Sequence, residues 1–201
     1  MPSVSPSRIM NALSVPQPVP LAQAYRLLNH GPTVLVSSAH GARRNIMAAS
    51  WSMPLDFDPP KVAVVLDRAT LTRELVDASG EFVLAVPCRA IAEQTLAAGR
   101  SSGRDGDKFA ALEFETFPAS RVAAPLPVGC IAWLECRVID EPGIQHTYDL
   151  FLGEVLAAWA DPAEFSDGRW HFSADERRSI HYVSGGQFFA TGEVFEVSTT
   201  G

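Results

Sequence analysis

The sequence is short of basic residues and of long apolar runs, and each shortage excludes a class of function. No stretch approaches the ~20 uninterrupted apolar residues that span a bilayer, so we expect no membrane association. Sixteen Lys and Arg stand against 23 Asp and Glu, which gives a net charge of -7, and no basic run is present. Because nucleic-acid affinity comes mainly from clustered cations that neutralise phosphates, we expect no nucleic-acid partner either.

Cysteine is scarce as well. Cys88, Cys130 and Cys136 stand alone, with no C-x-x-C pair and an odd count. This pattern argues against a disulfide framework and fits a reducing compartment, and we interpret each thiol as a small buried hydrophobe. Residues 1–20 carry five prolines and no apolar core of signal-peptide length. We therefore interpret them as a loose Pro-rich N-terminal arm and expect a cytoplasmic protein.

The motifs of several enzyme classes are missing. There is no P-loop, and no G-x-G-x-x-G follows a predicted strand. The histidines form no i, i+4 pair, so no metal site is expected, and we interpret His146 and His181 as surface or satisfied core side chains. Residues 99–103 match the G-x-S-x-G of hydrolases, but a nucleophile elbow needs a strand before it and a helix after it. A predicted helix precedes this segment and a turn follows it, which indicates a flexible loop.

What is present is the composition of a folded domain, with 47% hydrophobic and 19% charged residues. A chain of this length can bury one sizeable core without disulfides, and we assign residues 21–201 to a single domain. Strands are predicted at 33–37, 45–51, 61–67, 81–87, 131–140, 148–159 and 187–190, and short helices at 21–29, 72–79, 89–98 and 107–112. Thr70 or Thr72 should cap the second helix, and Gly80 should end it.

The strands outnumber the helices and do not alternate with long helices. This pattern predicts a mainly β fold with short helices, in which an antiparallel sheet closes on itself, and not a doubly wound sheet. Residues 55–60 are expected to form an extended loop, because each proline in them bars the preceding residue from helix.

Residues 45–51 combine small side chains, a Trp and polar groups on one predicted strand. A flat heteroaromatic ring could lie along such a strand, since its alanines and serine let the ring approach the backbone amides. Met47 or Trp51 could then cover a face of the ring. An ordinary core strand has the same composition and is the alternative interpretation.

Residues 68–72 join the end of a predicted strand to the start of a helix. They supply the guanidinium of Arg68, the hydroxyls of Thr70 and Thr72, and free helix N–H groups, a combination suited to a phosphate. Plain N-capping is the alternative, and it accounts for one Thr but not for Arg68. A planar ring followed by a phosphate has the shape of flavin mononucleotide (FMN).

At these residues the sequence resembles the flavin reductase-like family, in its flavoredoxin-like branch with the FMN-binding split barrel. The resemblance runs from about Leu21 to Glu193 and rests on segments in the family's order. They are the ring strand 45–51, the D-P-P-type loop 55–60, the phosphate turn 68–72 with S-G-E-F at 79–82, the S-G-R-D-x-D-K-F segment 102–109, and the late strand 150–155. Two positions depart from the family's pattern: Tyr148 stands where many relatives have His, and Ala85 where many have Asn.

The resemblance implies a split β-barrel that binds FMN non-covalently and forms a homodimer with its flavins near the interface. The cofactor-binding residues that it implies are Asn45, Met47, Ala48, Ala49, Ser50 and Trp51 for the isoalloxazine, and Arg68, Thr70 and Thr72 for the phosphate, with Lys108 shaping the site. No catalytic acid or base is assigned, because the cofactor carries the chemistry.

The reaction that the resemblance implies is reduction of flavin by NADH or NADPH, with hydride transfer to flavin N5. The choice between the two nicotinamides, and between FMN and FAD as exchangeable flavin, stays open. One alternative is an FMN-bound electron carrier or ferric-type reductase fed by a protein partner. The others are a non-enzymatic split barrel that binds haem or another ligand and a cofactor-free dimeric interaction protein. An oxygenase or electron-transfer protein would be the partner of the enzyme.

Overall fold

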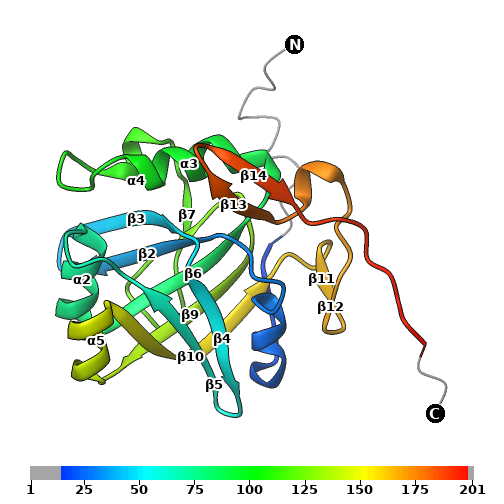
Figure 1. Ribbon diagram of the computed structural model, residues 1–201, viewed down its shortest axis with the longest axis horizontal. Helices are drawn as coiled ribbons and strands as arrows, with labels where there is room; N and C mark the ends of the chain where they lie inside the picture. The colour runs from blue at the N-terminus through cyan, green and yellow to red at the C-terminus, as the bar shows by residue number, and fades with distance from the viewer. Residues whose placement is uncertain (1–14, 199–201) are drawn as a thin grey trace.

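The computed structural model describes residues 15–198, and its centre is one antiparallel sheet of eight strands (Figure 1). Seven strands follow in the order β3-β2-β6-β9-β10-β5-β4, and β1 pairs with β10. Their bounds are β1 Gln17–Pro18, β2 Val34–His40, β3 Arg43–Ala49, β4 Ser52–Phe57, β5 Pro60–Val65, β6 Glu81–Pro87, β9 Cys130–Ile139 and β10 Leu150–Ala160.

The sheet closes into a split barrel. β3 and β4 stand at opposite ends of the strand order, yet only Ser50 and Trp51 connect them in the chain. Because such a link reaches only roughly 10 Å, the two ends of the sheet must come together. The Val65 N–H also donates to the Trp51 carbonyl at 3.0 Å, which ties this link to β5. The mainly β fold with a split barrel, predicted from the sequence, is confirmed.

Short helices and three small hairpins surround the barrel. The helices are η1 Leu21–Leu27, α2 Leu71–Ser79, η2 Arg89–Ile91, α3 Ala92–Arg100, α4 Lys108–Ala111, α5 Pro142–Tyr148 and η3 Asp175–Arg177, where η marks a 3-10 helix. The hairpins pair β7 Thr116–Phe117 with β8 Leu126–Pro127, β11 Phe165–Ser166 with β12 Arg169–Trp170, and β13 Ile180–Ser184 with β14 Gln187–Ala190. In Figure 1, α3 and α4 lie above β3 and β2, and the β13–β14 hairpin lies beside α3.

Side chains are buried on both faces of the central strands. In β2, Val34 and Val36 belong to the cluster that fills the barrel, whereas Leu35 belongs to a second cluster. The second cluster also holds Ile91 and Phe109, from the elements that cover the outside of the sheet. A strand covered on both faces needs apolar residues at every position, which is why these strands appear as continuous apolar runs without alternation.

The threonine cap and the terminal glycine predicted for the second helix are confirmed in α2. The Thr70 hydroxyl accepts a hydrogen bond from the Arg73 N–H at 3.2 Å, so Thr70, and not Thr72, is the N-cap. Gly80 ends the helix with φ +70°, a left-handed conformation that glycine adopts without strain. Asp107 caps α4 in the same way, by accepting the Phe109 N–H at 2.9 Å.

The prediction that residues 55–60 form a loop was wrong. Residues 55–57 complete β4, and Pro60 begins β5 after a tight turn with a cis Asp58–Pro59 bond. Strand pairing tolerates the prolines because Pro54 lies in β4, the end strand of the sheet, Pro59 lies in the turn, and Pro60 is the first residue of β5. A missing N–H costs little at such positions.

Other element boundaries also differ from the expectation. The first helix is a 3-10 helix that ends at Leu27, and α3 extends to Arg100, so Gly99 and Arg100 are helical and not part of a loop. Both α5 and β13 were missed. β13 carries mostly exposed residues and therefore shows no alternation of apolar and polar side chains.

The described part of the N-terminal arm is not loose. Gln17 and Pro18 pair with β10, and Val19 is buried and donates its N–H to the Ala158 carbonyl at 2.8 Å. Residues 1–14 of the predicted arm lie outside the described residues. The three cysteines are free and buried, as predicted. Over residues 15–198, no helix is both long enough and apolar enough to cross a membrane.

Candidate functional site

Three neighbouring cavities surround β3. The first, here the Lys108 cavity, has a volume of about 410 Å³ and lies between β3, the start of α2 and the end of α3. It is lined by Asn45, Met47, Ala48, Asp67, Ala69, Thr70, Leu71, Ala98, Gly99, Arg100, Ser101, Ser102, Gly103 and Lys108.

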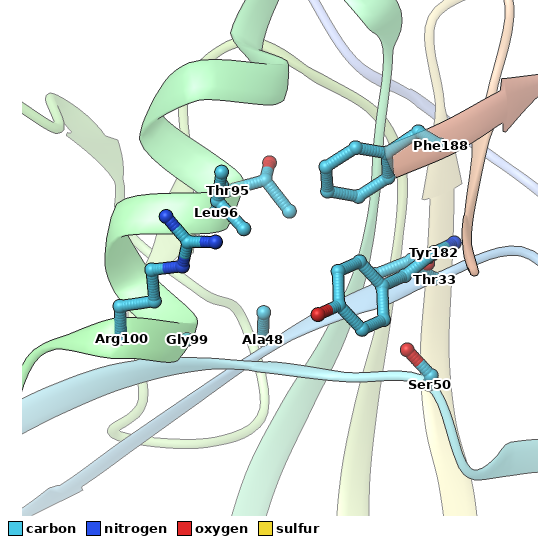
Figure 2. A pocket seen from close by; sticks show the side chains of 9 residues that line it. All are labelled: Thr33, Ala48, Ser50, Thr95, Leu96, Gly99, Arg100, Tyr182 and Phe188. Carbon is cyan, nitrogen blue, oxygen red and sulfur yellow. The ribbon is translucent and has the colours of Figure 1, made fainter. Parts of the chain in front are cut away.

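The second, here the split cavity, has a volume of about 550 Å³ and lies where the two ends of the barrel meet. Its lining residues are Met47, Ala49, Ser50, Trp51, Val65, Asp67, Tyr148, Asp149, Tyr182 and Val183. The third, here the hairpin cavity, has a volume of about 170 Å³ and is lined by Thr33, Ala48, Ser50, Thr95, Leu96, Gly99, Arg100, Tyr182 and Phe188 (Figure 2). Shared residues of β3 and its exit make one wall common to all three cavities.

β3 is an end strand that pairs only with β2, so the backbone groups on its outer edge have no strand partner. Unpaired N–H and C=O groups on such an edge are ready to bond the donors and acceptors of a ligand. The small side chains keep that edge accessible: a Cβ added at Gly99 of α3 would lie only 3.3 Å from the Ala48 Cβ. Larger residues at 48 or 99 would therefore narrow the space beside the strand.

Lys108 brings an uncompensated cation to its cavity. It is 4% exposed, and its Nζ donates to the carbonyls of Ala98 at 2.5 Å and Ser101 at 3.1 Å. Within residues 15–198 no carboxylate pairs with it. Burial lowers the pKa of Lys108 to about 8, so the amine is still mostly charged at pH 7. A buried charge without a counter-ion favours binding of an anion.

The start of α2 lies in the wall of the same cavity. Ala69, Thr70 and Leu71 line it, and α2 is nine residues long. The first N–H groups of a helix and its dipole both attract negative charge. Two of the first N–H groups are already used, since Ala69 donates to the Asp67 carboxylate at 2.7 Å and Thr70 donates to the Asp67 carbonyl at 3.0 Å. Lys108 and the N–H groups that follow these two therefore suit this end of the site to a phosphate.

Asn45 forms another part of the cavity wall. Its Nδ2 donates to the Thr72 hydroxyl at 2.9 Å, and its buried Oδ1 accepts no hydrogen bond. A side chain at Gly103 would collide with the Asn45 amide, so a glycine is needed there. Thr72 is fully buried in this bond and does not line the cavity, and the unpaired Asn45 oxygen is itself buried beside Gly103.

Arg68 lies apart from the other predicted phosphate ligands. Its exposed guanidinium pairs with Asp149 at 3.2 Å and donates to the His146 carbonyl at 2.9 Å, and it does not line the Lys108 cavity. Arg100, which sequence reasoning missed, lines that cavity and the hairpin cavity. No motif marks Arg100 in the sequence, because its position depends on where α3 ends.

The remaining predicted residues lie along β3 and its exit. Met47 is half-buried and borders two cavities, and Ser50 also borders two. Trp51 lines the split cavity and is 76% exposed. Ala49 is buried against the barrel core and also borders the split cavity. The structure thus brings Asn45, residues 47–51, Thr70 and Lys108 to the linings of adjoining cavities and leaves Arg68 and Thr72 outside them.

The two histidines that sequence reasoning considered border none of these cavities. His146 Nδ1 bonds the Pro142 carbonyl at 2.7 Å, and His181 bonds Gly31 and Thr191. Among residues 15–198 no group of three or more His, Cys, Asp or Glu could hold a metal ion. Tyr148, which replaces the family's His, lines the split cavity and is 67% exposed.

Comparisons with known proteins agree with this fold. The chain is 44% identical over 179 residues to the uncharacterized protein YddH of Escherichia coli K12, covering 88% of this chain and 95% of that one. The crystal structure of an FMN-binding domain of a flavin reductases-like enzyme from Shewanella baltica is 46% identical, with a TM-score of 0.90, and covers 93% of this chain and 100% of that chain.

A more distant solved structure is the flavoredoxin of Desulfovibrio vulgaris, 27% identical with a TM-score of 0.74 and 94% of each chain covered. Residues 26–181, most of the chain, match the model of the flavin reductase like domain. The split barrel seen in the structure agrees with this family match. The chain therefore belongs to the flavin reductase-like family and has its FMN-binding split-barrel fold.

Proposed function

We propose that the protein binds FMN non-covalently along β3 and reduces it with NADH or NADPH. The observation behind this proposal is that the Lys108 cavity and the split cavity share a wall, since Met47 and Asp67 line both. We take the two together as one hollow, with Lys108 at one end to attract an anion and an unpaired strand edge along the other. The Shewanella baltica protein, at 46% identity, is an FMN-binding domain, which supports the same ligand here.

The anionic end fits the phosphate of FMN. A phosphate monoester carries a charge of about -1.5 to -2 at neutral pH. The Lys108 ammonium and the N–H groups at the start of α2 would neutralise part of this charge, with Thr70 beside them. A ligand of this kind also supplies the counter-ion that the buried amine lacks.

The rest of the hollow fits the sugar alcohol chain and the ring. The polar Asn45 residue lines the cavity where the ribityl chain would pass. Main-chain groups from Met47 to Trp51 would bond the edge of the isoalloxazine, and the Met47 side chain would pack on its face. When bound, FMN supplies the hydride chemistry at N5, and the part of these residues is to hold and orient the ring and to keep water from it.

We also propose that the protein acts as a homodimer. Met53, Leu55 and Phe57 alternate along β4 and are 53%, 44% and 65% exposed, and Trp51 precedes them. An exposed apolar row on an end strand is a surface that proteins usually cover. A second copy on this row would also border the split cavity through Trp51.

Size-exclusion chromatography with light scattering tests the dimer. We expect a mass of twice the chain mass of 21.7 kDa. Leu55→Glu should shift the mass towards the monomer, whereas the control Val197→Glu, at another exposed apolar residue, should not. Elution of the unaltered protein at the monomer mass would contradict the dimer. A cytoplasmic site of action fits the free buried thiols.

The function itself is tested by an absorbance spectrum of the purified protein with FMN, followed by NADH and NADPH under anaerobic conditions. Bleaching of a bound flavin band by either nucleotide supports the reductase and identifies the donor. A bound flavin that neither nucleotide reduces favours the second candidate, an FMN-bound electron carrier, to which the likeness to a flavoredoxin points. Failure to bind FMN would contradict both. The reductase would supply reduced flavin to an oxygenase or an electron-transfer protein.

A further inference from the structure

The β13–β14 hairpin is fixed against the barrel at the edge of β3. The Thr33 N–H donates to the Ile180 carbonyl at 2.8 Å, and the Tyr182 N–H donates to the Thr33 hydroxyl at 2.7 Å. At the far end of the hairpin, a Cβ added at Gly186 would lie 3.1 Å from an Arg100 nitrogen, so the turn closes directly on the end of α3. The hairpin is thus a third wall beside β3 and α3.

These walls enclose the hairpin cavity and carry aromatic, aliphatic and polar side chains. Tyr182 and Phe188 form an aromatic wall, with ring centroids 5.3 Å apart and an edge-to-face arrangement. Leu96 and Ala48 add apolar surface on the other sides. Figure 2 shows the Arg100 guanidinium and the Tyr182 hydroxyl on opposite sides of the same hollow.

The polar groups of the cavity are available to a ligand. In the part of the chain that the structure describes, neither the Arg100 guanidinium nor the Tyr182 hydroxyl makes a side-chain hydrogen bond or ion pair. A guanidinium presents its donors in a flat fork that matches a carboxylate, and aromatic rings pack on a planar ligand. A cavity of about 170 Å³ is smaller than the sites of drug-sized ligands, so one ring fills it.

The geometry points to a subsite for a small aromatic carboxylate in the hairpin cavity. Its ring lies between Leu96 and the Tyr182–Phe188 wall, and its carboxylate is held by Arg100 and the Tyr182 hydroxyl. The floor of this subsite is Ala48 and Ser50, which belong to the segment that we assign to the isoalloxazine. Its role as a substrate or effector site beside the flavin rests on the proposed function, whereas its affinity for the anion depends only on residues of this chain.

The test uses benzoate as the anionic probe and benzamide as its neutral counterpart, titrated by calorimetry into the protein with and without FMN. We expect benzoate to bind about tenfold or more tightly than benzamide, a preference typical of a charge-assisted contact. Arg100→Gln should remove this preference and leave benzamide unaffected. Arg121→Gln, a change at another exposed arginine, should change neither affinity.

Phe188→Ala tests the aromatic wall separately. Phe188 borders the hairpin cavity but neither of the others, so this variant should weaken both probes and leave FMN affinity unchanged. Absence of benzoate binding, competition between benzoate and FMN, or a loss of FMN affinity in Arg100→Gln as large as the loss of benzoate affinity would each overturn the subsite. Benzoate binding to a protein that does not bind FMN would contradict the proposed function alone.

Discussion

Lys108 and His30 are both basic side chains that the fold takes largely out of water, and comparing them shows why one of them keeps a charge that can attract an anion and the other does not. Burial lowers the pKa of Lys108 to about 8, and burial together with the nearby His181 lowers the pKa of His30 to about 4. The same physical cause leaves the two groups in different charge states at pH 7, because the pKa of lysine starts from a much higher value than that of histidine. Lys108 stays mostly charged, whereas His30 is neutral.

Their partners match these charge states. The Lys108 ammonium donates to two carbonyls and borders a cavity, while His30 Nε2 bonds the Ser179 hydroxyl at 2.8 Å and its ring packs against Trp170 with centroids 5.3 Å apart. The charged Lys108 amine is thus suited to bind a ligand, whereas the neutral His30 ring contributes to packing. Substitutions at the two residues and changes of pH separate these two roles.

Lys108→Met removes the charge and keeps most of the side-chain volume. We expect FMN affinity to fall by about 10- to 100-fold, the usual range for loss of a charge-assisted hydrogen bond in a desolvated site. Flavin fluorescence titration measures it. The control is Lys61→Met, since Lys61 pairs with Asp56 at 2.6 Å on the β4–β5 hairpin and borders none of the three cavities. Equal losses in both variants would mean that Lys108 does not bind the phosphate.

The second prediction concerns the change of FMN affinity with pH. The phosphate favours the protonated amine, so binding raises the pKa of Lys108 from its value of about 8 in the free protein. Affinity should therefore decline as pH rises above about 8, by at most about tenfold per pH unit, and the decline should vanish in Lys108→Met. Titrations between neutral and alkaline pH measure it. An unchanged pH profile in the variant would assign the titration to another group.

His30 should govern stability and not binding. Its pKa is about 4 in the folded protein and about 6.5 when unfolded, so the unfolded state binds the extra proton between these values. The contribution of His30 to the free energy of unfolding should fall as pH drops through this window, by on the order of 1–3 kcal/mol, and stay level below it. Urea unfolding of the unaltered protein and of His30→Gln measures this slope. His40→Gln, at an exposed histidine, is the control, and a slope that persists in His30→Gln would contradict the assignment.

Arg68→Ala should have the smallest effect on FMN affinity. The Arg68 charge is already paired with Asp149 and lies outside the Lys108 cavity, so we expect a loss of no more than about threefold, within the range of exposed ion pairs. The same fluorescence titration measures it beside Lys108→Met. A loss as large as that of Lys108→Met would show that Arg68 leaves Asp149 to bind the phosphate, as the sequence resemblance implied.

Much of the fold could be predicted from the sequence, because its signals are local. Thr70 and Gly80 bound α2 through their own hydrogen bond and backbone conformation, and residues 81–87 form β6 as predicted. β4 was missed because prolines forbid helix but do not forbid an end strand, and the position of a strand in a sheet is not a local property. The exposed β13 was missed because without a buried face it leaves no apolar pattern.

For the site, local sequence was enough to predict a strand with small residues at 45–49, although β3 begins at Arg43 and ends before Ser50, and the threonine cap at the start of α2. Both depend on neighbours in the chain. Which charged groups line the cavities follows from the tertiary structure alone. It buries Lys108 against two carbonyls, pairs Arg68 with Asp149, and brings Arg100 and Tyr182 to one cavity from elements far apart in the chain. The physical reason is that desolvation and ion pairing depend on what surrounds a side chain in space, which local sequence does not specify.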